Sequence, residues 1–349
     1  MIRVLVVEDS PLQRNLLKLL LESDGDIQVV GVAENGAQGV EMARALKPDL
    51  ITMDIRMPVM NGFEATRRIM QENPTPIVVV SASVEAPDLA ITFNAIKAGA
   101  LEVIEKPANV GTAGFEEMRK HLLATVKGMA MVRVKDRKFS ASVASNKTAP
   151  APPAKPNVAA RVPRVLVVGA STGGPPALAV FLKALPHPFS LPVVIVQHMA
   201  QGFTRGFVDW LKTESALPLA IANENQITQP GTAYFAPDDT HLIFTQRGLL
   251  KITHEPPVNY VRPSVTVLFN SVANVYGADA IGVLLTGMGI DGGAGLLAMH
   301  QRGAYTIAQD EATSSVYGMP KAAADLNAAD EILPLQAIAP AIVAHLKAK

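Results

Sequence analysis

The sequence predicts an α/β protein with two domains, each built around a parallel or mostly parallel sheet. The chain has 349 residues, which is more than one hydrophobic core usually serves. Short β-branched or apolar runs alternate with helix-like stretches of ten or more residues along most of its length. Near the middle, the segment Ala149–Pro156 holds four prolines in eight positions and divides this alternation in two.

In the N-terminal half, five strands alternate with helical segments. Ser10 and Pro11 predict a helix start, because a capping hydroxyl precedes a proline at the first helical position. The leucines from Leu16 to Leu21 then mark one apolar face. Five strand–helix repeats in about 130 residues indicate a parallel sheet covered on both faces. The strands are expected at Val4–Val7, Gln28–Val32, Asp49–Met53, Ile77–Val80 and Leu101–Ile104.

Between about Val134 and Val162 the composition changes to Ser, Ala and Pro. Proline fixes φ and cannot continue a helix or a strand ladder, so this stretch predicts an extended, semi-stiff linker. We therefore expect a first domain at residues 1–125, a helix end and Pro/Ala/Ser-rich linker at 126–161, and a second domain at 162–349.

The second domain is predicted to be a doubly wound, mostly parallel α/β domain with a small antiparallel hairpin. Two runs close together on either side of Gln246-Arg247-Gly248 indicate the hairpin, so we expect a mixed sheet. Strands are expected at Val165–Val168, Val193–Val196, Tyr234–Ala236, His241–Thr245, Leu249–Ile252, Ile281–Leu285 and Tyr305–Ile307. Helices are expected near Pro176–Ala184, Phe203–Lys212, Val265–Tyr276, Gly292–His300 and Ala337–Ala348.

Composition excludes several classes of function. Apolar residues make up 49% of the chain, and 31 basic residues balance 31 acidic ones, which argues against general disorder and against nucleic acid as a partner. The chain has no cysteine, so disulfides, thiolate zinc sites and cysteine nucleophiles are excluded. The sequence shows no signal peptide and no apolar stretch long enough to span a membrane. We expect a cytoplasmic protein with no membrane insertion.

The N-terminal half carries chemistry at the ends of its strands. Glu8 and Asp9 end the first strand, Asp54 the third, Ser81 the fourth and Lys106 the fifth. In an open parallel sheet, ligands bind at the carboxyl ends of the strands. A carboxylate cluster there suits Mg²⁺, and Asp54 could act as a nucleophile toward a phosphoryl group. The alternative is a set of solvated loop charges, which the agreement of five positions disfavours.

This pattern resembles the receiver domain of bacterial response regulators over roughly residues 1–125. The resemblance implies a flavodoxin-like fold, phosphotransfer from a histidine kinase to Asp54, and Mg²⁺ held by Glu8, Asp9 and Asp54. It also implies that Ser81 and Lys106 couple phosphorylation to a surface change. Three residues before Lys106, where many receivers carry an aromatic switch residue, this chain has Val103. The motifs are Glu8-Asp9, Asp54 followed by Met57-Pro58 and Asn61-Gly62, Ser81-Ala82 and Lys106-Pro107.

The C-terminal half offers a serine on a tight turn. Gly169–Gly174 follows a strand, leads into a helix and matches the G-x-S-x-G spacing that exposes a serine hydroxyl, here Ser171. The alternative is a phosphate-binding glycine turn. The dinucleotide fingerprint fails, however, because Ser replaces its second glycine, and no Gly-Lys-Ser/Thr follows for a P-loop.

A base and a carboxylate are expected on the same sheet edge. Among seven histidines, His198 follows a strand directly. Asp291 stands in the glycine-rich turn Thr286–Gly293 after another strand. A serine activated by a histidine that a carboxylate orients is the acyl-transfer arrangement. An α/β-hydrolase would require the order Ser-Asp-His with His300 as base, but His300 falls within an expected helix.

Together the C-terminal motifs resemble the catalytic domain of chemotaxis protein-glutamate methylesterases of the CheB type. They are Gly169–Gly174, Gln197-His198-Met199, Arg262-Pro263-Ser264-Val265, Thr286–Gly293 and Gly318-Met319-Pro320. The resemblance implies hydrolysis of γ-glutamyl methyl esters on the cytoplasmic domains of methylated chemoreceptors, with release of methanol and often glutamine deamidation. A chemotaxis histidine kinase would be the phosphodonor.

By the same resemblance, Ser171 is the nucleophile, His198 the general base and Asp291 its orienting partner. Thr172, Met288 and Gly289 lie where backbone donors for the oxyanion could come from. The catalytic domain is expected to need no cofactor. The chain departs from the family at three positions: Ile290 replaces a frequent Asn, Ala200 a frequent Pro and Thr266 the usual Asp.

Three alternatives belong to other classes of function. A response regulator with a degenerate output domain would act by protein binding alone, and the presence of all three triad residues disfavours it. DNA-binding output is suggested by five basic residues between Lys127 and Lys138, but no helix-turn-helix pattern accompanies them. Metal catalysis in the second domain is disfavoured because no pair of its histidines has ligand spacing.

Overall fold

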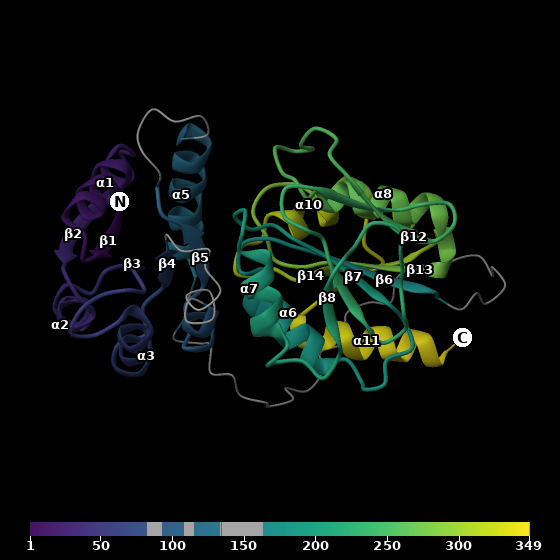
Figure 1. The fold of residues 1–349 in the computed structure, drawn as a ribbon, viewed down its shortest axis with the longest axis horizontal. Helices are drawn as coiled ribbons and strands as arrows, with labels where there is room; N and C mark the ends of the chain where they lie inside the picture. The colour runs from purple at the N-terminus through teal and green to yellow at the C-terminus, as the bar shows by residue number, and fades with distance from the viewer. Residues whose placement is uncertain (82–92, 108–114, 133, 135–162, 349) are drawn as a thin grey trace.

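The computed structural model describes residues 1–81, 93–107, 115–132, 134 and 163–348. Within these residues lie two main sheets with helices on both faces, one in each half of the chain (Figure 1). The expected linker lies outside the described residues from position 135 onward.

The N-terminal sheet is parallel, with strand order β2-β1-β3-β4-β5. All five expected strands are present. The β-branched and apolar residues of β1, β3 and β4 are almost all buried, as a parallel sheet between two helical layers requires, whereas those of the edge strand β2 are mostly half-buried or exposed. The strands are β1 (Ile2–Val7), β2 (Ile27–Ala33), β3 (Leu50–Met53), β4 (Ile77–Ser81) and β5 (Glu102–Glu105).

Four labelled helices cover this sheet: α1 (Pro11–Glu22), α2 (Gly36–Leu46), α3 (Gly62–Glu72) and α5 (Phe115–Ala130). The predicted start of α1 is confirmed, because the Ser10 side chain accepts a hydrogen bond from the backbone of Gln13. Alternate strand residues face opposite cores. Val4 and Val6 pack with α1 and α5, whereas Leu5 and Val7 pack with α2 and α3. A further short helical segment covers residues 93–97.

The C-terminal main sheet has seven parallel strands in the order β15-β14-β13-β6-β7-β10-β8. The expectation that this sheet is mixed is wrong, because all seven of its strands are parallel. The hairpin of β11 and β12 pairs with β9 in a separate antiparallel sheet of three strands. The main strands are β6 (Val165–Ala170), β7 (Val193–Gln197), β8 (Leu219–Ile221), β10 (Ala233–Phe235), β13 (Ala280–Leu284), β14 (Tyr305–Gln309) and β15 (Glu331–Leu333). The small sheet comprises β9 (Gln226–Ile227), β11 (His241–Phe244) and β12 (Leu249–Thr253).

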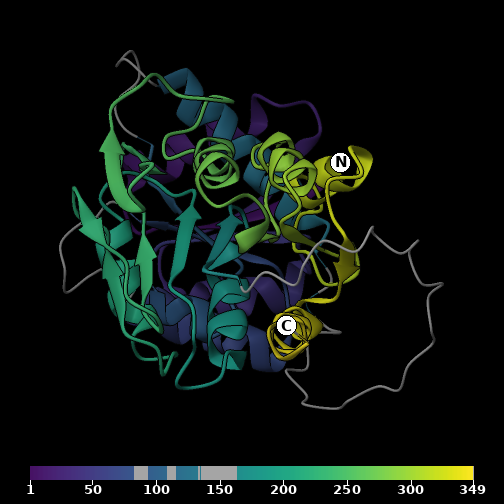
Figure 2. The same ribbon diagram turned by 90° about the vertical axis from the view of Figure 1, so that its right-hand side faces the viewer.

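Helices lie on both faces of the seven-stranded sheet (Figure 2). One face packs against α6 (Gly174–Ala184), α7 (Thr204–Leu211) and α11 (Leu335–Lys347). The other packs against α8 (Val265–Val275), α9 (Gly293–Gln301) and α10 (Met319–Asp325). Because β13, β6 and β7 are neighbours, the loops after these three strands meet at one edge of the sheet.

The two halves contact each other through β5 and residues 93–97, which meet α6 and α7, and through α5, which meets the loop before α10 (Figure 1). Phe93 is fully buried among three aromatic rings at α7, with ring centroids 5.6 to 6.5 Å away. Lys97 forms an ion pair of 2.8 Å with Glu214. The edge strand β5 is therefore covered by the C-terminal half, which removes an exposed sheet edge.

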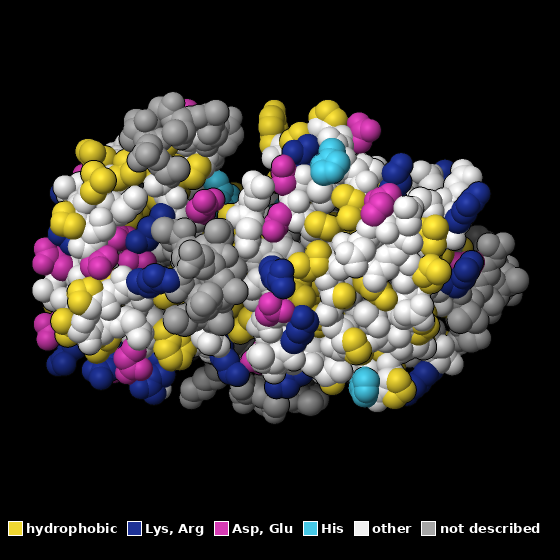
Figure 3. Space-filling view, viewed as in Figure 1, with side chains coloured by type: hydrophobic (Ala, Val, Ile, Leu, Met, Phe, Trp, Pro, Cys, Tyr) yellow, Lys and Arg dark blue, Asp and Glu magenta, His cyan; other side chains and the backbone are white. Residues whose placement is uncertain are grey.

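The surface shown in Figure 3 intersperses basic and acidic side chains, in keeping with the zero net charge. This face offers no broad basic patch of the kind that binds nucleic acid. Among the described helices, none is both long enough and apolar enough to cross a membrane.

Candidate active site

Ser171 stands on the tight turn between β6 and α6. The backbone N–H of Ser171 donates to Thr286 O (3.0 Å), and that of Gly174 donates to Ser171 O (2.7 Å). Gly173 has φ of 74°, and a Cβ on it would lie 2.3 Å from Ser315 Cβ. Only glycine suits both the left-handed backbone and the close approach at this position. The predicted nucleophile turn is therefore present, and Ser171 is 8% exposed within it.

His198 follows β7, the strand next to β6. Its backbone N–H donates to Ala170 O at 3.0 Å. The side chain of Gln197 joins the two loops, because its Nε2 donates both to Ser171 O (2.9 Å) and to His198 O (2.8 Å). The backbones that carry the serine and the histidine are thus held together by one buried amide.

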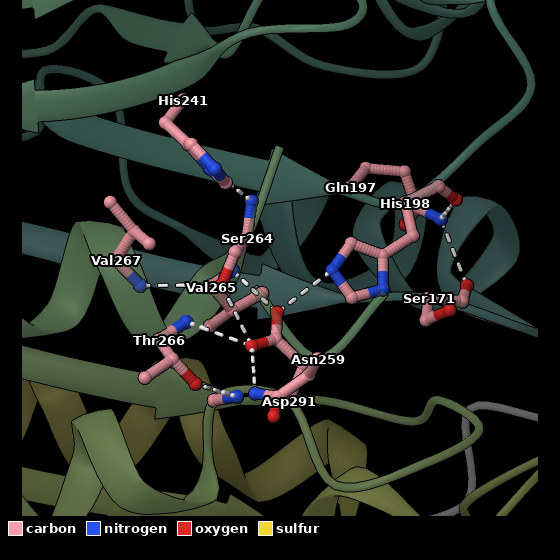
Figure 4. Close-up of polar contacts among 11 residues, drawn as sticks. Ser171, Gln197, His198, His241, Asn259, Ser264, Val265, Thr266, Val267 and Asp291 are labelled. Atoms are coloured by element: carbon pink, nitrogen blue, oxygen red, sulfur yellow. Dashed lines mark hydrogen bonds and ion pairs between the residues drawn. The ribbon is translucent and has the colours of Figure 1, made fainter. Parts of the chain in front are cut away.

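Asp291 orients the imidazole of His198 from the other side (Figure 4). The distance between His198 Nε2 and Asp291 Oδ2 is 3.0 Å. A carboxylate only accepts hydrogen bonds, so this contact assigns the ring hydrogen to Nε2 and leaves the Nδ1 lone pair free. His198 can therefore act as a base through Nδ1.

Asp291 is held by four further donors, all from the loop before α8 and the start of that helix (Figure 4). They are Asn259 Nδ2 at 3.0 Å, Ser264 Oγ at 2.8 Å, Val265 N at 2.6 Å and Thr266 N at 3.3 Å. Burial alone would raise the pKa of this carboxyl group. The hydrogen bonds and the charge of His198 outweigh burial and hold the pKa well below its usual range. Asp291 is therefore ionised at neutral pH.

The start of α8 explains why these donors converge. Ser264 is the N-cap residue of α8, and its own backbone N–H donates to Nδ1 of the fully buried His241 (3.1 Å). The first backbone N–H groups of a helix have no partner within it, so a carboxylate at that end is stabilised. Thr266, where the family usually has Asp, accepts from Gly292 N through Oγ1 at 2.8 Å. It thereby fixes the turn that carries Asp291.

The structure brings Ser171, His198 and Asp291 to one edge of the sheet, as expected. It does not test the expected oxyanion roles, which remain predictions. Thr172 is buried, and its carbonyl oxygen accepts from Thr286 Oγ1 at 3.0 Å. Met288 is half-buried and Gly289 exposed in the turn after β13.

His300 lies within α9, as expected, with Nδ1 3.3 Å from Thr306 Oγ1. It also lies 3.4 Å from Asp330 Oδ1. These contacts give it a structural place outside the Ser171 site, and the α/β-hydrolase alternative is not supported.

Sequence reasoning missed two residues that reach the site from distant segments. Asn259 belongs to a two-residue turn closed by backbone hydrogen bonds between Val258 and Val261. Asn259 has a φ of 53°, a left-handed conformation that asparagine tolerates. The residue type was therefore the one available signal in the sequence. Glu102 of β5 accepts a hydrogen bond from Gly173 N at 2.8 Å. Its signal was a charged residue inside the apolar run Leu101–Ile104.

A second site lies at the carboxyl edge of the N-terminal sheet. Carboxylate oxygens of Glu8, Asp9 and Asp54 all lie within 4.8 Å of one another. Lys106 Nζ lies 2.8 Å from Glu8 Oε2 and 2.9 Å from Asp54 Oδ2. Ser81 lies beside them at the end of β4, where its carbonyl accepts from Lys106 N at 2.9 Å. The five predicted positions are therefore brought together.

The electrostatics of this second site suit a cation. Burial raises the pKa of both Glu8 and Asp54, against the opposing effect of Lys106. Burial lowers the pKa of Lys106, but its contacts with the two carboxylates outweigh this and the net pKa is raised. Three clustered carboxylates carry more negative charge than one ammonium neutralises. The all-oxygen donor set matches the preference of Mg²⁺.

Val103, which replaces the aromatic switch residue of many receivers, is partly buried between the two halves. It packs against the helical layer of α2 and α3 and also against the C-terminal core that contains α6 and α7. A signalling step that depends on rotation of an aromatic ring has no ring to use at this position.

The fold and the two sites define a class: a receiver-like domain with a carboxylate cluster at its sheet edge, joined to a second α/β domain with a serine, a histidine and an aspartate at one sheet edge. Two family models match the chain, one in each of these domains. The response regulator receiver domain matches residues 4–113, and CheB methylesterase matches residues 166–342.

Curated relatives agree over nearly the whole chain. A protein-glutamate methylesterase/protein-glutamine glutaminase 1 from Syntrophus aciditrophicus is 46% identical over 347 residues, covering 98% of each chain. A protein-glutamate methylesterase/protein-glutamine glutaminase from Nitrosospira multiformis is 45% identical and covers 98% of this chain and 96% of its own. The crystal structure of the Thermotoga maritima CheB methylesterase catalytic domain superposes with a TM-score of 0.51 at 35% identity. It covers 54% of this chain and 99% of its own. The chain belongs to the CheB methylesterase family, whose members are hydrolases.

Proposed function

We propose that this protein is a phosphorylation-regulated methylesterase that hydrolyses glutamate γ-methyl esters on chemoreceptors and releases methanol. We propose glutamine deamidation as a second reaction at the same site. One observation carries the proposal: Ser171, His198 and Asp291 lie at one edge of the sheet, and Asp291 accepts five hydrogen bonds there. The family relatives, which carry both activities in their names, support the choice of substrate.

The proposed reaction proceeds in two steps. Ser171 Oγ attacks the γ-carbonyl carbon of the ester while His198 Nδ1 accepts the hydroxyl proton, and Asp291 stabilises the resulting imidazolium. Collapse of the tetrahedral intermediate breaks the bond to the methoxy group, which leaves as methanol with the proton from His198. Water then attacks the acyl-serine ester with His198 again as base, giving the glutamate carboxylate and free Ser171. Deamidation follows the same route with ammonia as the leaving group.

Regulation is proposed to act through the receiver half. Glu8, Asp9 and Asp54 would hold Mg²⁺, which would neutralise charge on an incoming phosphoryl group. Asp54 would accept that group from a chemotaxis histidine kinase, and Lys106 and Ser81 would contact it. In the resting protein, the receiver half covers the side of the catalytic domain at α6 and α7, and phosphorylation would move it.

The proposed division of the chain is a receiver domain at 1–125, a helix end and linker at 126–161, and a catalytic domain at 162–349. The proposed partners are the cytoplasmic domains of methylated chemoreceptors as substrate and the kinase as phosphodonor. The competing hypothesis of a degenerate output domain that acts by binding alone predicts no turnover, so activity decides between the two.

The test is methanol release from membranes that carry methylated receptors, measured with and without acetyl phosphate and Mg²⁺. Ser171→Ala should lower the phosphorylated rate by at least about 10⁴-fold, because losing a triad nucleophile removes the covalent route. Ser190→Ala is the matched control, since Ser190 is an exposed serine of the same domain. Wild-type turnover by Ser171→Ala would show that the nucleophile is misassigned. Absence of methanol release by the phosphorylated wild type would overturn the function.

A further inference from the structure

One carboxylate of the receiver half reaches into the catalytic half and ends on the turn that carries Ser171. Glu102 is the first residue of β5, and only 8% of its surface is exposed. Its Oε2 accepts from Gly173 N at 2.8 Å, and its Oε1 accepts from Val103 N at 3.1 Å. Both oxygens of a buried carboxylate are thus bound by backbone N–H groups, one from each half of the protein.

Gly173 belongs to the wall of the candidate active site. It lies two residues after Ser171 in the same turn, and a Cβ built on it would meet Ser315 and, at 3.3 Å, Thr286 Oγ1. Thr286 also accepts from Ser171 N through its carbonyl oxygen. Gly173 is the N-cap of the eleven-residue helix α6, and a helix N-terminus favours bound anions. Independently of that tendency, the structure shows a carboxylate bound there.

The chemistry of this carboxylate is that of the proposed product. Hydrolysis of a γ-methyl ester leaves a glutamate side chain, and Glu102 presents that same side chain to the catalytic turn. We propose that the Gly173 N–H forms a carboxyl-binding site that takes the γ-carboxyl group of the product glutamate and the corresponding ester group of the substrate, and that Glu102 fills this site in the resting protein as an internal product mimic. This inference rests on the proposed methylesterase function and specifies how its site is blocked.

Contacts around Glu102 hold it in place. Phe93 packs among the aromatic rings at α7, and Val103 packs against the same C-terminal core. On the other side, α5 meets the loop before α10, where a Cβ on Gly128 would lie 3.3 Å from Val316 Cγ2. Val316 is itself bonded to the catalytic wall, because its backbone N–H donates to Thr286 Oγ1 at 2.9 Å. The receiver half therefore contacts the wall of the site at two points.

The binding of Glu102 in this site is reversible, because burying its carboxyl group costs free energy. Burial raises the pKa of Glu102 to about 7, because the hydrogen bonds from Gly173 and Val103 offset only part of the lost hydration. No cation among the described residues pairs with Glu102; a buried carboxylate in such surroundings is costly, and the raised pKa of Glu102 reflects this cost. When the receiver half moves away, Glu102 becomes hydrated again. This gain in hydration makes it easier for phosphorylation to release the receiver half from the catalytic half.

The test uses the full-length, unphosphorylated protein and its basal rate of methanol release. Glu102→Ala should raise this rate about tenfold or more, the equivalent of one hydrogen bond between a side chain and the backbone. Glu102→Gln keeps the size of the side chain but offers one acceptor oxygen to two N–H donors, so a smaller rise is expected. Glu105→Gln, an exposed carboxylate change on the same strand, should leave the basal rate unchanged.

Two further measurements separate a carboxyl-binding site from a merely loosened interface. Lys97→Ala removes the ion pair to Glu214 at the edge of the contact and should raise the basal rate less than Glu102→Ala does. N-acetylglutamate at tens of millimolar should inhibit Glu102→Ala, whose site is open, and should not change the basal rate of the wild type.

Each contrary result has a distinct meaning. A basal rate of Glu102→Ala and Glu102→Gln equal to wild type would overturn the proposal, provided that the phosphorylated wild type releases methanol. Activation of Glu102→Ala without inhibition by N-acetylglutamate would overturn the carboxyl-binding site. Equal activation by Lys97→Ala would do the same. If the phosphorylated wild type releases no methanol, the proposed function itself fails.

Discussion

Replacing Asp291 with asparagine changes one oxygen of a side chain that accepts five hydrogen bonds. Oδ2 accepts from His198 Nε2 and Val265 N, while Oδ1 accepts from the other three donors. An asparagine amide offers an oxygen to only one of these two sets. If its NH₂ faces His198, the imidazole must carry its hydrogen on Nδ1, and it loses the lone pair that accepts the proton from Ser171.

The size of the loss follows from either orientation of the amide. A histidine trapped in the wrong tautomer lowers the turnover of comparable triads by about 10⁴-fold. If the oxygen faces His198 instead, the tautomer survives but the carboxylate charge is lost. Two unit charges 3.0 Å apart attract by about 5.5 kcal/mol at an effective dielectric constant of about 20, which is again about 10⁴-fold. Asp291→Asn should therefore retain about one part in 10⁴ of the wild-type rate.

Methanol release by the phosphorylated protein measures this loss, with Asp325→Asn as the control. Asp325 is an exposed aspartate of α10 that pairs with Lys321, and its change should leave the rate as it is. Circular dichroism should show that Asp291→Asn remains folded. A loss of less than about tenfold in a folded Asp291→Asn protein would refute the assignment of Asp291 as the partner of His198.

Three further outcomes are expected. Asp54→Asn should abolish activation by acetyl phosphate and Mg²⁺ and keep the basal rate, because the hydrolytic residues lie in the other half; activation equal to wild type would contradict the phosphorylation site. Phe93→Ala removes a ring buried among three aromatic side chains at α7, a change that costs about 3–5 kcal/mol in a core, so basal methanol release should rise at least tenfold. An unchanged basal rate would argue against covering of the site by the receiver half. The pKa of Glu102 is raised by burial to about 7 from 4.5, so the docked protein holds a proton that the undocked protein releases. Docking is then strongest below about pH 4.5 and weakens as the pH rises through about 7. The basal rate of wild type divided by that of Glu102→Ala should rise between about pH 5.5 and 8, because effects common to both proteins cancel in the ratio; a flat ratio would exclude this linkage.

Hydrophobic runs predict every strand of four or more residues, including β11 and β12 of the small sheet, and one three-residue strand, β10. The expected elements missed β8, β9 and β15, which have two or three residues each, too few to show a period. The helix α10 was also missed, because Gly318 and Pro320 at its start resemble a turn. The hairpin was predicted correctly, but the separate sheet that it forms with β9 was not, because strand pairing depends on packing between residues that lie far apart along the chain.

Some residues of the candidate site could likewise be predicted from the sequence, and others could not. Ser171 and His198 could be predicted because each directly follows a strand, and Asp291 because it stands in the glycine-rich turn after one. Parallel strands bring their carboxyl ends to one edge. Asn259 and Glu102 could not be predicted, because their partners lie 32 and 71 residues away along the chain. No local pattern encodes such contacts, which arise only when loops and domains pack.

The strand β5 places one demand on the sequence that neither site alone would impose. Glu102 begins it, and Lys106, which contacts Asp54, follows its last residue. Side chains alternate along a strand, so these two residues share one face, about 13 Å apart at 3.3 Å per residue. Inserting or deleting a single residue would turn one of them to the opposite face. This segment must therefore keep its length for both ends to retain their partners.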